Sequence, residues 1–228
     1  DINKSLNFPI LKNKNILISC GATFEKIDDA RAITNLSSGK MGLRIADEAY
    51  ALGANVTIIY GKTEKLPPSG INCIYAPNHS LMSKYVKENA KNNDIFISVA
   101  AISDYIPKTI SGKLKKGNNR LSLELQQSSD ILLETASKFN NLFCVGFSAE
   151  SENIIKNAQV KLTNKHLDMI VANSINESMG QNSAEIYIID KNEVIHIPKK
   201  SKEELASNIL QHIYKLENKK GSAHEHIN

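Results

Sequence analysis

The segment Thr34–Gly42 (TNLSSGKMG) combines residue types that suit an anionic ligand and leads directly into a stretch of helical period. Glycines allow close backbone approach, and free N–H groups at a helix start favour an anion. Ser37, Ser38 and Lys40 add hydroxyl and ammonium donors. The segment is not a Walker A loop, because Thr34 stands where the first glycine would be needed, and it lacks G-x-G-x-x-G. An ordinary capped helix start explains the same residues, so spacing alone leaves both interpretations open.

Two further groups of lysines could bind an anion. Lys113 opens the run KLKK on a loop that contains Gly112 and Gly117, which would let it fold over a ligand. Lys161 and Lys165 lie four residues apart on a predicted helix, so both ammonium groups can reach one triphosphate. Solvated surface lysines commonly show the same patterns, and the sequence by itself does not separate the two cases.

The elements that would position these groups alternate between strand and helix. Short apolar runs predict strands, and apolar residues three or four apart predict helices. The predicted strands cover residues 15–20, 55–60, 71–75, 94–99, 143–147 and 168–172, and the predicted helices cover 40–52, 80–92, 130–138 and 152–165. This alternation predicts an α/β fold with a doubly wound, Rossmann-like, mostly parallel sheet and helices on both faces.

The C-terminal part of the chain predicts a β-hairpin extension followed by a helix. Residues 185–189 and 194–197 flank a polar turn, as in a hairpin. Ser201 and Glu204 have the spacing of a capping box, and the helical period continues to Leu216. Earlier in the chain, residues 121–125 alternate in polarity and predict an edge strand.

We expect one domain over residues 15–217, with an N-terminal lead-in or linker at 1–14 and a disordered tail at 218–228. The first residue is Asp1 and not methionine, which suggests the later part of a longer protein. In doubly wound sheets, ligands bind beyond the carboxyl ends of the strands. The polar loops 21–35, 100–116 and 148–151 follow three predicted strands and should therefore converge on one crevice.

Composition excludes several classes of function. The net charge of +4 is too small to indicate nucleic-acid binding. No apolar run approaches the ~18 residues that a membrane helix requires, and no secretory signal opens the chain. Cys20, Cys73 and Cys144 form no C-x-x-C pair, which argues against a disulfide framework or a zinc site. We therefore expect a cytoplasmic protein that binds neither nucleic acid nor membranes.

The stretch Ile33–Gly42 (ITNLSSGKMG) resembles the signature of the bacterial phosphopantothenoylcysteine synthetases. Further matches to that family occur in order along the chain, which makes a chance resemblance improbable. They are Gly21–Thr23, Glu25, Asp28 and Arg31, then Ala100-Ala101 with Asp104-Tyr105, Lys113–Lys116, Asp130–Leu132, Gly146-Phe147 with Ala149-Glu150, and Asn173.

The resemblance implies a CTP-dependent ligation of 4′-phosphopantothenate with L-cysteine in coenzyme A biosynthesis. The carboxylate would attack the α-phosphate of CTP, releasing pyrophosphate and leaving an acyl-cytidylate. The amine of cysteine would then release CMP. Because two anions must approach each other, cations and bound Mg²⁺ should contribute most of the catalysis. The metal ligands are not evident. The family also implies a homodimer, for which the hairpin over residues 185–197 is a candidate contact.

The resemblance also implies roles for individual residues. Asn35 would hold the acyl-cytidylate through its uncharged amide, Lys113 would be needed to form it, and the small Ala101 would let the backbone approach. The implied nucleotide-binding residues are Ser98, Val99, Ala100, Asp104, Lys113, Ser129, Asp130, Ile131, Leu132, Phe147, Lys161 and Lys165. The implied substrate-binding residues are Asn35, Ser37, Ser38, Gly39 and Lys40.

Some features depart from the family pattern or suggest other functions. Ser129 replaces a proline common in the family, which predicts a less rigid loop. The flavin-dependent decarboxylase to which this domain is often fused has no counterpart here, so we predict neither FMN binding nor decarboxylation. An NAD(P)-dependent short-chain reductase would need Tyr-x-x-x-Lys, but Thr109 stands four residues after Tyr105. A non-catalytic nucleotide-binding subunit is the other alternative. Cys20 has no evident histidine partner and is rejected as a nucleophile.

Overall fold

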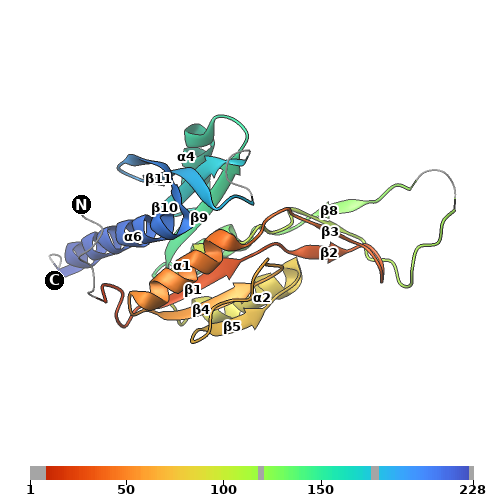
Figure 1. The fold of residues 1–228 in the computed structure, drawn as a ribbon, viewed down its shortest axis with the longest axis horizontal. Helices are drawn as coiled ribbons and strands as arrows, with labels where there is room; N and C mark the ends of the chain where they lie inside the picture. Colours follow the sequence, from red (N-terminus) through yellow and green to blue (C-terminus); the bar gives the residue numbers. More distant parts are fainter. Residues whose placement is uncertain (1–8, 118–120, 176–179, 226–228) are drawn as a thin grey trace.

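A computed structural model describes residues 9–117, 121–175 and 180–225, and its core is an eight-stranded sheet (Figure 1). Across the sheet the strands lie in the order β12-β11-β10-β9-β6-β1-β4-β5. Their bounds are β1 Asn15–Cys20, β4 Asn55–Tyr60, β5 Asn72–Tyr75, β6 Ile95–Ser98, β9 Phe143–Glu150, β10 Met169–Ser174, β11 Ser183–Asp190 and β12 Val194–Ser201.

The first six of these strands along the chain are parallel, and β11 and β12 add an antiparallel hairpin at one edge. Counted along the chain, the parallel strands have the spatial order 3-2-1-4-5-6, which is the order of the Rossmann fold. The chain changes direction between β1 and β6, so the fold places its ligand crevice beyond the carboxyl ends of these two strands.

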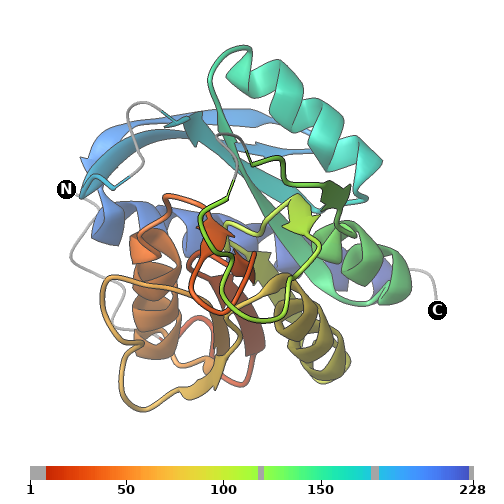
Figure 2. The same ribbon diagram turned by 90° about the vertical axis from the view of Figure 1, so that its right-hand side faces the viewer.

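Helices cover both faces of the sheet, as predicted (Figure 2). On one face lie α1 (Lys40–Ala51) and α6 (Lys202–Glu225), and on the other α2 (His79–Ala90), α3 (Ile131–Lys138) and α4 (Ile154–Asn164). Strand β1 is buried on both sides. Ile16 and Ile18 pack in the core beneath α1 and α6, and Leu17 packs in the core beneath α2, α3 and α4. This burial on both faces explains why β1 has no alternation of apolar and polar residues.

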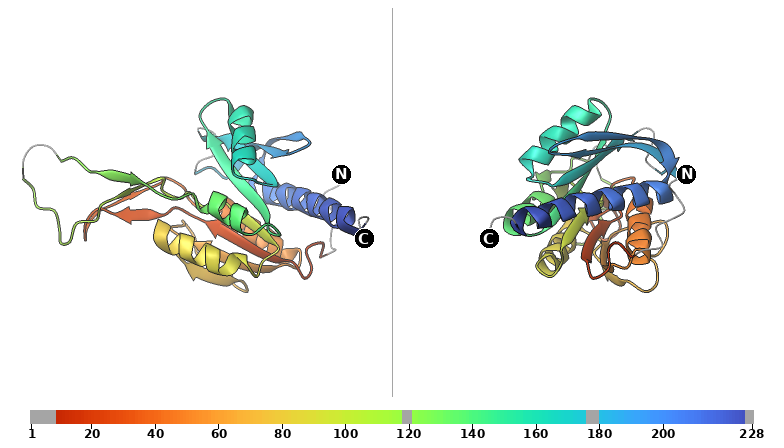
Figure 3. Two further views of the ribbon diagram at one scale, coloured as in Figure 1. Left: turned by 180° about the vertical axis from the view of Figure 1, so that it is seen from behind. Right: turned by 90° about the vertical axis from the view of Figure 1, so that its left-hand side faces the viewer.

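Two short hairpins project from the body as an arm (Figures 1 and 3). One pairs β2 (Phe24–Lys26) with β3 (Ala32–Thr34), and the other pairs β7 (Tyr105–Pro107) with β8 (Leu125–Gln127). The edge strand predicted over residues 121–125 is wrong except at its last residue. Pairing between β7 and β8 stops at Pro107, because proline has no N–H to continue the ladder.

The ends of the described chain bear on the two predicted terminal segments. Within the predicted lead-in or linker, Leu11 is fully buried and its N–H donates to the Leu52 carbonyl at 3.1 Å, so this residue packs against the domain. At the other end, α6 continues to Glu225, so the disordered tail predicted from residue 218 is wrong as far as 225. One glycine in a helix costs only about 1 kcal/mol, so Gly221 does not end it. Residues 1–8 and 226–228 lie outside the described residues.

The start of α6 confirms the predicted capping box. The Ser201 N–H donates to Glu204 Oε2 at 3.1 Å, and the Glu204 N–H donates to Ser201 Oγ at 3.2 Å. This reciprocal pair fixes the point at which α6 leaves β12. None of the described helices combines the length and apolarity needed to span a bilayer.

Candidate active site

A cavity of about 410 Å³ lies beyond the carboxyl ends of β6, β9 and β10, next to the start of α1. Its walls are Ser37–Gly42, Ser98–Ile102, Asp104, Ser128–Leu132, Phe147, Ala149, Lys161, Lys165, Val171, Asn173, Gly180, Ile186 and Lys202. All the predicted nucleotide- and substrate-binding residues except Asn35 and Lys113 are therefore brought together here. Of the three polar loops, the second and third contribute directly, whereas the first reaches the cavity only through the residues that follow it.

Asn35 lies directly behind the cavity wall. Its Nδ2 donates to the carbonyl of Ala101 at 2.9 Å, and Ala101 lines the cavity. The same carbonyl accepts from the Thr23 N–H at 3.1 Å, and the Ala101 N–H donates to the Gly21 carbonyl at 2.8 Å. Gly21 has a φ of 77°, and a Cβ there would lie 2.5 Å from the Lys62 carbonyl oxygen, so this tight turn requires glycine.

The first turn of α1 lies at the cavity wall. Its N-cap residue, Gly39, has no side chain to cap the helix, and the first turn contains no acidic residue. Ser37 Oγ accepts from the Gly39 N–H at 3.3 Å and Ser38 Oγ accepts from the Lys40 N–H at 3.5 Å. The Ser38 carbonyl accepts from the Glu64 N–H at 3.0 Å, which ties the preceding loop to the body. Free N–H groups and the helix dipole at this position favour an anion, as the serine- and glycine-rich segment predicted.

Two lysines that line the cavity, Lys161 on α4 and Lys165 directly after it, are held by carboxylates. Lys161 Nζ lies 2.6 Å from Glu150 Oε1 and 3.0 Å from Ser148 Oγ. Burial acts to raise the pKa of Glu150, but hydrogen bonds from Lys161, Ser148 and Asn157 outweigh it and hold that pKa below its ordinary value. Lys165 Nζ pairs with the carboxylate of Asp130 at 2.7 Å. Both ammonium groups are thus oriented at the wall before any ligand binds.

The Ser129–Leu132 loop is fixed without the proline common in the family. His79 Nε2 lies 2.8 Å from the Ser129 carbonyl oxygen, and its side chain is buried. Asp130 caps α3 by accepting from the Leu133 N–H at 3.0 Å. Sequence reasoning did not identify His79, because a single histidine fifty residues from the loop carries no local pattern.

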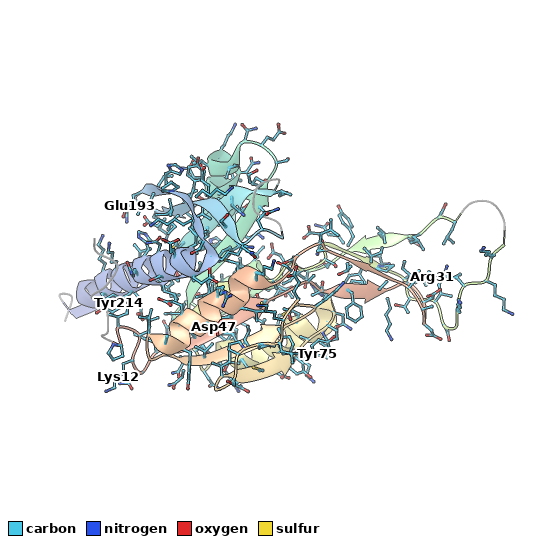
Figure 4. The ribbon with its side chains drawn as sticks, viewed as in Figure 1. Lys12, Arg31, Asp47, Tyr75, Glu193 and Tyr214 are labelled. Atoms are coloured by element: carbon cyan, nitrogen blue, oxygen red, sulfur yellow. The ribbon has the colours of Figure 1, made fainter. Side chains whose placement is uncertain are left out.

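Lys113 is not brought to the cavity. It is exposed on the arm, and backbone contacts of its neighbours tie that loop to the β2–β3 hairpin. The Leu114 N–H donates to Asp28 Oδ2 at 3.0 Å, and Arg31 Nη2 donates to the Leu114 carbonyl at 2.6 Å. Figure 4 shows Arg31 on this arm, away from the body of the protein.

The ion pair of Asp28 and Arg31 organises the base of this loop. Two guanidinium nitrogens of Arg31 contact Asp28 Oδ2, at 3.0 and 2.5 Å. Burial acts to raise the pKa of Asp28, but hydrogen bonds from Arg31 and from three backbone N–H groups outweigh it, so the pKa lies well below its ordinary value. The acidic-to-arginine pattern thus has a structural explanation.

Cys20 is unsuited to nucleophilic chemistry, as its sequence context predicted. Burial raises the pKa of its thiol to about 12, so the reactive thiolate is not formed near neutral pH. Its Sγ lies 3.2 Å from the Gly39 carbonyl oxygen, and a Cβ at Gly42 would approach that sulfur to 2.6 Å. Cys20 therefore serves to pack β1 against the start of α1.

Sequence reasoning missed several wall residues that are remote along the chain. Gly180, Ile186 and Lys202 come from the C-terminal hairpin and from the start of α6. The capping box of Ser201 and Glu204 predicted where α6 begins, but it did not indicate that Lys202, the residue after Ser201, lines a cavity.

The fold and the cavity define a Rossmann-like α/β protein with a crevice lined by lysines and serines at its topological switch point. Residues 11–216 match the family described as the DNA/pantothenate metabolism flavoprotein C-terminal domain. The chain belongs to this family, which confirms the resemblance found in the sequence. This membership sets aside the interpretation as a short-chain reductase.

Relatives and solved structures agree with this placement. The chain is 40% identical over 208 residues to the coenzyme A biosynthesis bifunctional protein CoaBC of Borreliella burgdorferi, covering 90% of this chain and 53% of that protein. It is 35% identical over 217 residues to CoaBC of Bacillus subtilis, covering 92% and 53%. The chain thus spans about half the length of the curated relatives it matches.

A crystal structure of the C-terminal domain of CoaBC superposes with a TM-score of 0.80 at 34% identity, covering 91% of this chain and 97% of that one. A Cab2 mutant in complex with phosphopantothenate-cysteine gives a TM-score of 0.72 at 15% identity, covering 92% and 89%, and so shares the fold.

Proposed function

We propose that this chain ligates 4′-phosphopantothenate with L-cysteine at the expense of CTP, in coenzyme A biosynthesis. The observation that carries the proposal is the cavity at the switch point, with the serine-rich start of α1 on one wall and Lys161 and Lys165 on another. Family membership supports it, as does the phosphopantothenate-cysteine bound to Cab2, which is the product of such a ligation.

In the first step, a carboxylate oxygen of phosphopantothenate attacks the α-phosphorus of CTP and pyrophosphate leaves, which gives an acyl-cytidylate. Both reactants are anions, so their approach must be electrostatically compensated. The N–H groups at the start of α1 and the ammonium groups of Lys161 and Lys165 suit the triphosphate, and they are already oriented. Phe147 and the Ser129–Leu132 backbone line the remaining wall and suit the base and ribose.

In the second step, the amine of cysteine attacks the acyl carbon, the bond to the phosphate oxygen breaks, and CMP leaves with that oxygen. The amine releases its proton to solvent. Asn35, whose Nδ2 donates to the carbonyl of the wall residue Ala101, would hold the intermediate without adding charge. The substrate carboxylate is anionic, and it becomes an uncharged acyl group in the acyl-cytidylate. A neutral amide suits this position, because a charged side chain would stabilise one of these two states over the other.

Mg²⁺ fits the cavity as a partner of the nucleotide. It usually keeps several waters and binds one or two carboxylates together with substrate phosphates. Asp104 and Asp130 are the carboxylates that line the cavity. Because Asp130 pairs with Lys165 and caps α3, Asp104 is the carboxylate that would hold the ion. When bound, the ion neutralises charge on the phosphate oxygens.

One cluster of three metal-compatible side chains occurs among the described residues, and it lies elsewhere. Asp190, Glu193 and His212 are at the opposite end of the sheet, where Asp190 pairs with the first residue of β10. Asp190 accepts from His212 at 2.9 Å and from the Asn192 N–H at 2.7 Å, which explains this cluster as a turn-fixing contact.

We further propose a homodimer in which the arm contacts a second copy of the chain. Large apolar side chains are exposed along the arm and its base, including Leu36 at 83% and Tyr105 at 55%. Such exposure on a projecting element is typical of a protein interface. A partner's arm would also bring a Lys113 to the cavity. The candidate hairpin contact is less favourable, because Pro198 and Lys199 on β12 oppose strand pairing at that edge.

The experiment that tests the ligase function is an assay of the purified chain with nucleotide, phosphopantothenate, cysteine and Mg²⁺. Pyrophosphate release should require both CTP and phosphopantothenate, and kcat/KM should be higher for CTP than for ATP. No pyrophosphate release with either nucleotide would instead favour a non-catalytic nucleotide-binding subunit. Neither step of the proposed ligation requires FMN.

A further inference from the structure

His79, the first residue of α2, contacts two distant parts of the chain at once. Its backbone N–H donates to Glu25 Oε1 at 2.8 Å, and its ring Nε2 lies 2.8 Å from the Ser129 carbonyl oxygen. Glu25 belongs to β2 at the base of the arm, whereas Ser129 lines the cavity. His79 is 7% exposed and Glu25 is 6% exposed, so water has little access to either side chain. The start of α2 therefore joins the arm to the cavity wall.

The contact with Ser129 determines which ring nitrogen of His79 carries a hydrogen. A carbonyl oxygen can only accept, so Nε2 must be the donor. The neutral ring with a hydrogen on Nε2 and the imidazolium both donate from this atom, so the contact does not depend on the charge of the ring. His79 thus supplies a constant donor to the loop, and this contact involves no proton transfer.

The backbone of His79 is itself fixed from the side of the arm. Next to Glu25 in β2, the Phe24 N–H donates to the Pro77 carbonyl at 2.8 Å. The Asn78 side chain caps α2 by accepting from the Leu81 N–H at 3.0 Å. The carboxylate of Glu25 also lies at the start of α2, where the helix dipole favours an anion. The position of the imidazole therefore depends on the arm as well as on α2.

The Ser129 carbonyl sets the orientation of the peptide that joins Ser129 to Asp130. This peptide is trans, so its C=O and its N–H point in opposite directions. With the carbonyl directed at His79, the Asp130 N–H points away from His79. Among the described residues, none accepts a hydrogen bond from this N–H. Ser129 and Asp130 both line the cavity, so this donor is available to a ligand there.

We propose that His79 is a positioning residue for the nucleotide, because its hold on the Ser129 carbonyl turns the Asp130 N–H toward the ligand. This inference rests on the proposed ligase function, which places CTP in the cavity. His79 does not line the cavity itself, so it acts through the loop. Since Glu25 holds His79, the base of the arm is coupled to nucleotide binding through this histidine.

The test measures CTP binding by isothermal titration with Mg²⁺ and without the other substrates, so that no turnover occurs. His79→Leu removes the donor and should weaken CTP about tenfold, the effect of losing one hydrogen bond that orients the loop. His79→Gln keeps a side-chain N–H at a similar reach and should stay within about twofold of wild type. Equal binding by wild type and His79→Leu would overturn the inference and leave the ligase function standing. A wild type that binds no CTP would refute both.

The matched control is Lys87→Met on the same helix. Lys87 Nζ lies 2.7 Å from Glu134 Oε2, so this variant also removes a link between α2 and α3 but leaves the Ser129 carbonyl held. It should bind CTP as the wild type does. In steady-state kinetics, His79→Leu should raise the KM for CTP and leave the KM for cysteine unchanged. A lower melting temperature with an unchanged KM for CTP would give His79 a purely structural role and overturn the proposal.

A double-mutant cycle tests the coupling to the arm. Because Glu25 acts through His79, Glu25→Ala should weaken CTP binding less in the His79→Leu background than in the wild type. The same loss in both backgrounds would overturn the coupling.

Hydrogen exchange of the wild type covers the case in which these variants do not fold. CTP should slow exchange at the Asp130 N–H, which it would contact, and at the His79 N–H, which donates to Glu25. The end of α2 near Ala90 should exchange at an unchanged rate. Protection of Asp130 without any change at His79 would overturn the proposal.

Discussion

Lys161 and Glu150 form an ion pair in the wall of the cavity, with Nζ 2.6 Å from Oε1. Glu150 also accepts from Ser148 and from Asn157, so its carboxylate stays satisfied when the lysine turns toward a ligand. Lys161 is 42% exposed in its side chain, whereas that of Glu150 is 15% exposed. Glu150 therefore positions the Lys161 ammonium group and leaves it accessible to a ligand.

Lys161→Met should raise the KM for CTP about tenfold or more, because one charge-assisted contact with the triphosphate contributes roughly 1.5–3 kcal/mol. The melting temperature should fall by only about a few degrees, since a half-exposed ion pair contributes little to stability. The matched control is Lys156→Met on the exposed side of the same helix, α4. An unchanged KM for CTP in Lys161→Met would remove this lysine from the nucleotide site.

Asn35→Ala should lower kcat/KM about 100-fold or more and leave the melting temperature nearly unchanged. The amide makes one hydrogen bond to the Ala101 carbonyl, which contributes only about 1 kcal/mol to stability, so the main loss is in holding the intermediate. Asn35→Asp should be at least as impaired, because its charge would repel the substrate carboxylate. Near-wild-type turnover in either variant would contradict the role given to Asn35.

Lys113→Gln should abolish activity while the fold is kept, because an exposed arm lysine supplies charge and not packing. Lys108→Gln, at another exposed arm position, is the control. If the arm of one subunit serves the cavity of its partner, mixing inactive Lys113→Gln with inactive Asn35→Ala should restore activity. With random mixing, about half of the dimers contain one subunit of each variant, and each of these has one intact site of two. The mixture would therefore recover ~25% of the wild-type rate. No recovery on subunit exchange would argue that the arm acts within its own subunit.

Asp28→Asn should destabilise the protein at neutral pH, and the difference from wild type should shrink in acid. The pKa of Asp28 is lower in the folded state than in the unfolded state, where it is about 4. The ionised side chain therefore contributes its full stabilisation above about pH 4. This stabilisation is lost as the pH falls below the unfolded-state pKa and through the folded-state pKa. Urea denaturation of both proteins at neutral pH and near pH 3 measures this. A pH-independent difference would show that the carboxylate charge is not what anchors the arm.

The parallel sheet and the edge at which the cavity lies were predictable from local patterns, whereas most individual wall residues were predicted only from the family resemblance. Runs such as Ile95–Ser98 are buried throughout because both faces of the strand are covered. The carboxyl ends of such strands share one edge, so polar loops after them had to meet.

The arm and the remote cavity residues were not predictable. The arm is built from three-residue strands, which are too short to show a period, and it is fixed by the Asp28–Arg31 pair rather than by apolar residues. Lys202 lines the cavity, and His79 contacts the backbone of the wall residue Ser129, only because helices from distant parts of the chain start nearby. A single residue at a helix start carries no pattern that distinguishes a binding role from a surface one.

The most direct test of the ligase mechanism follows one oxygen atom. Phosphopantothenate labelled with oxygen-18 in its carboxylate is turned over with CTP, cysteine and Mg²⁺, and the CMP is analysed by mass spectrometry. If the carboxylate attacks the α-phosphate and cysteine then attacks the acyl carbon, each CMP must carry one labelled oxygen. Unlabelled CMP, formed together with phosphopantothenoylcysteine, would contradict an acyl-cytidylate in this cavity.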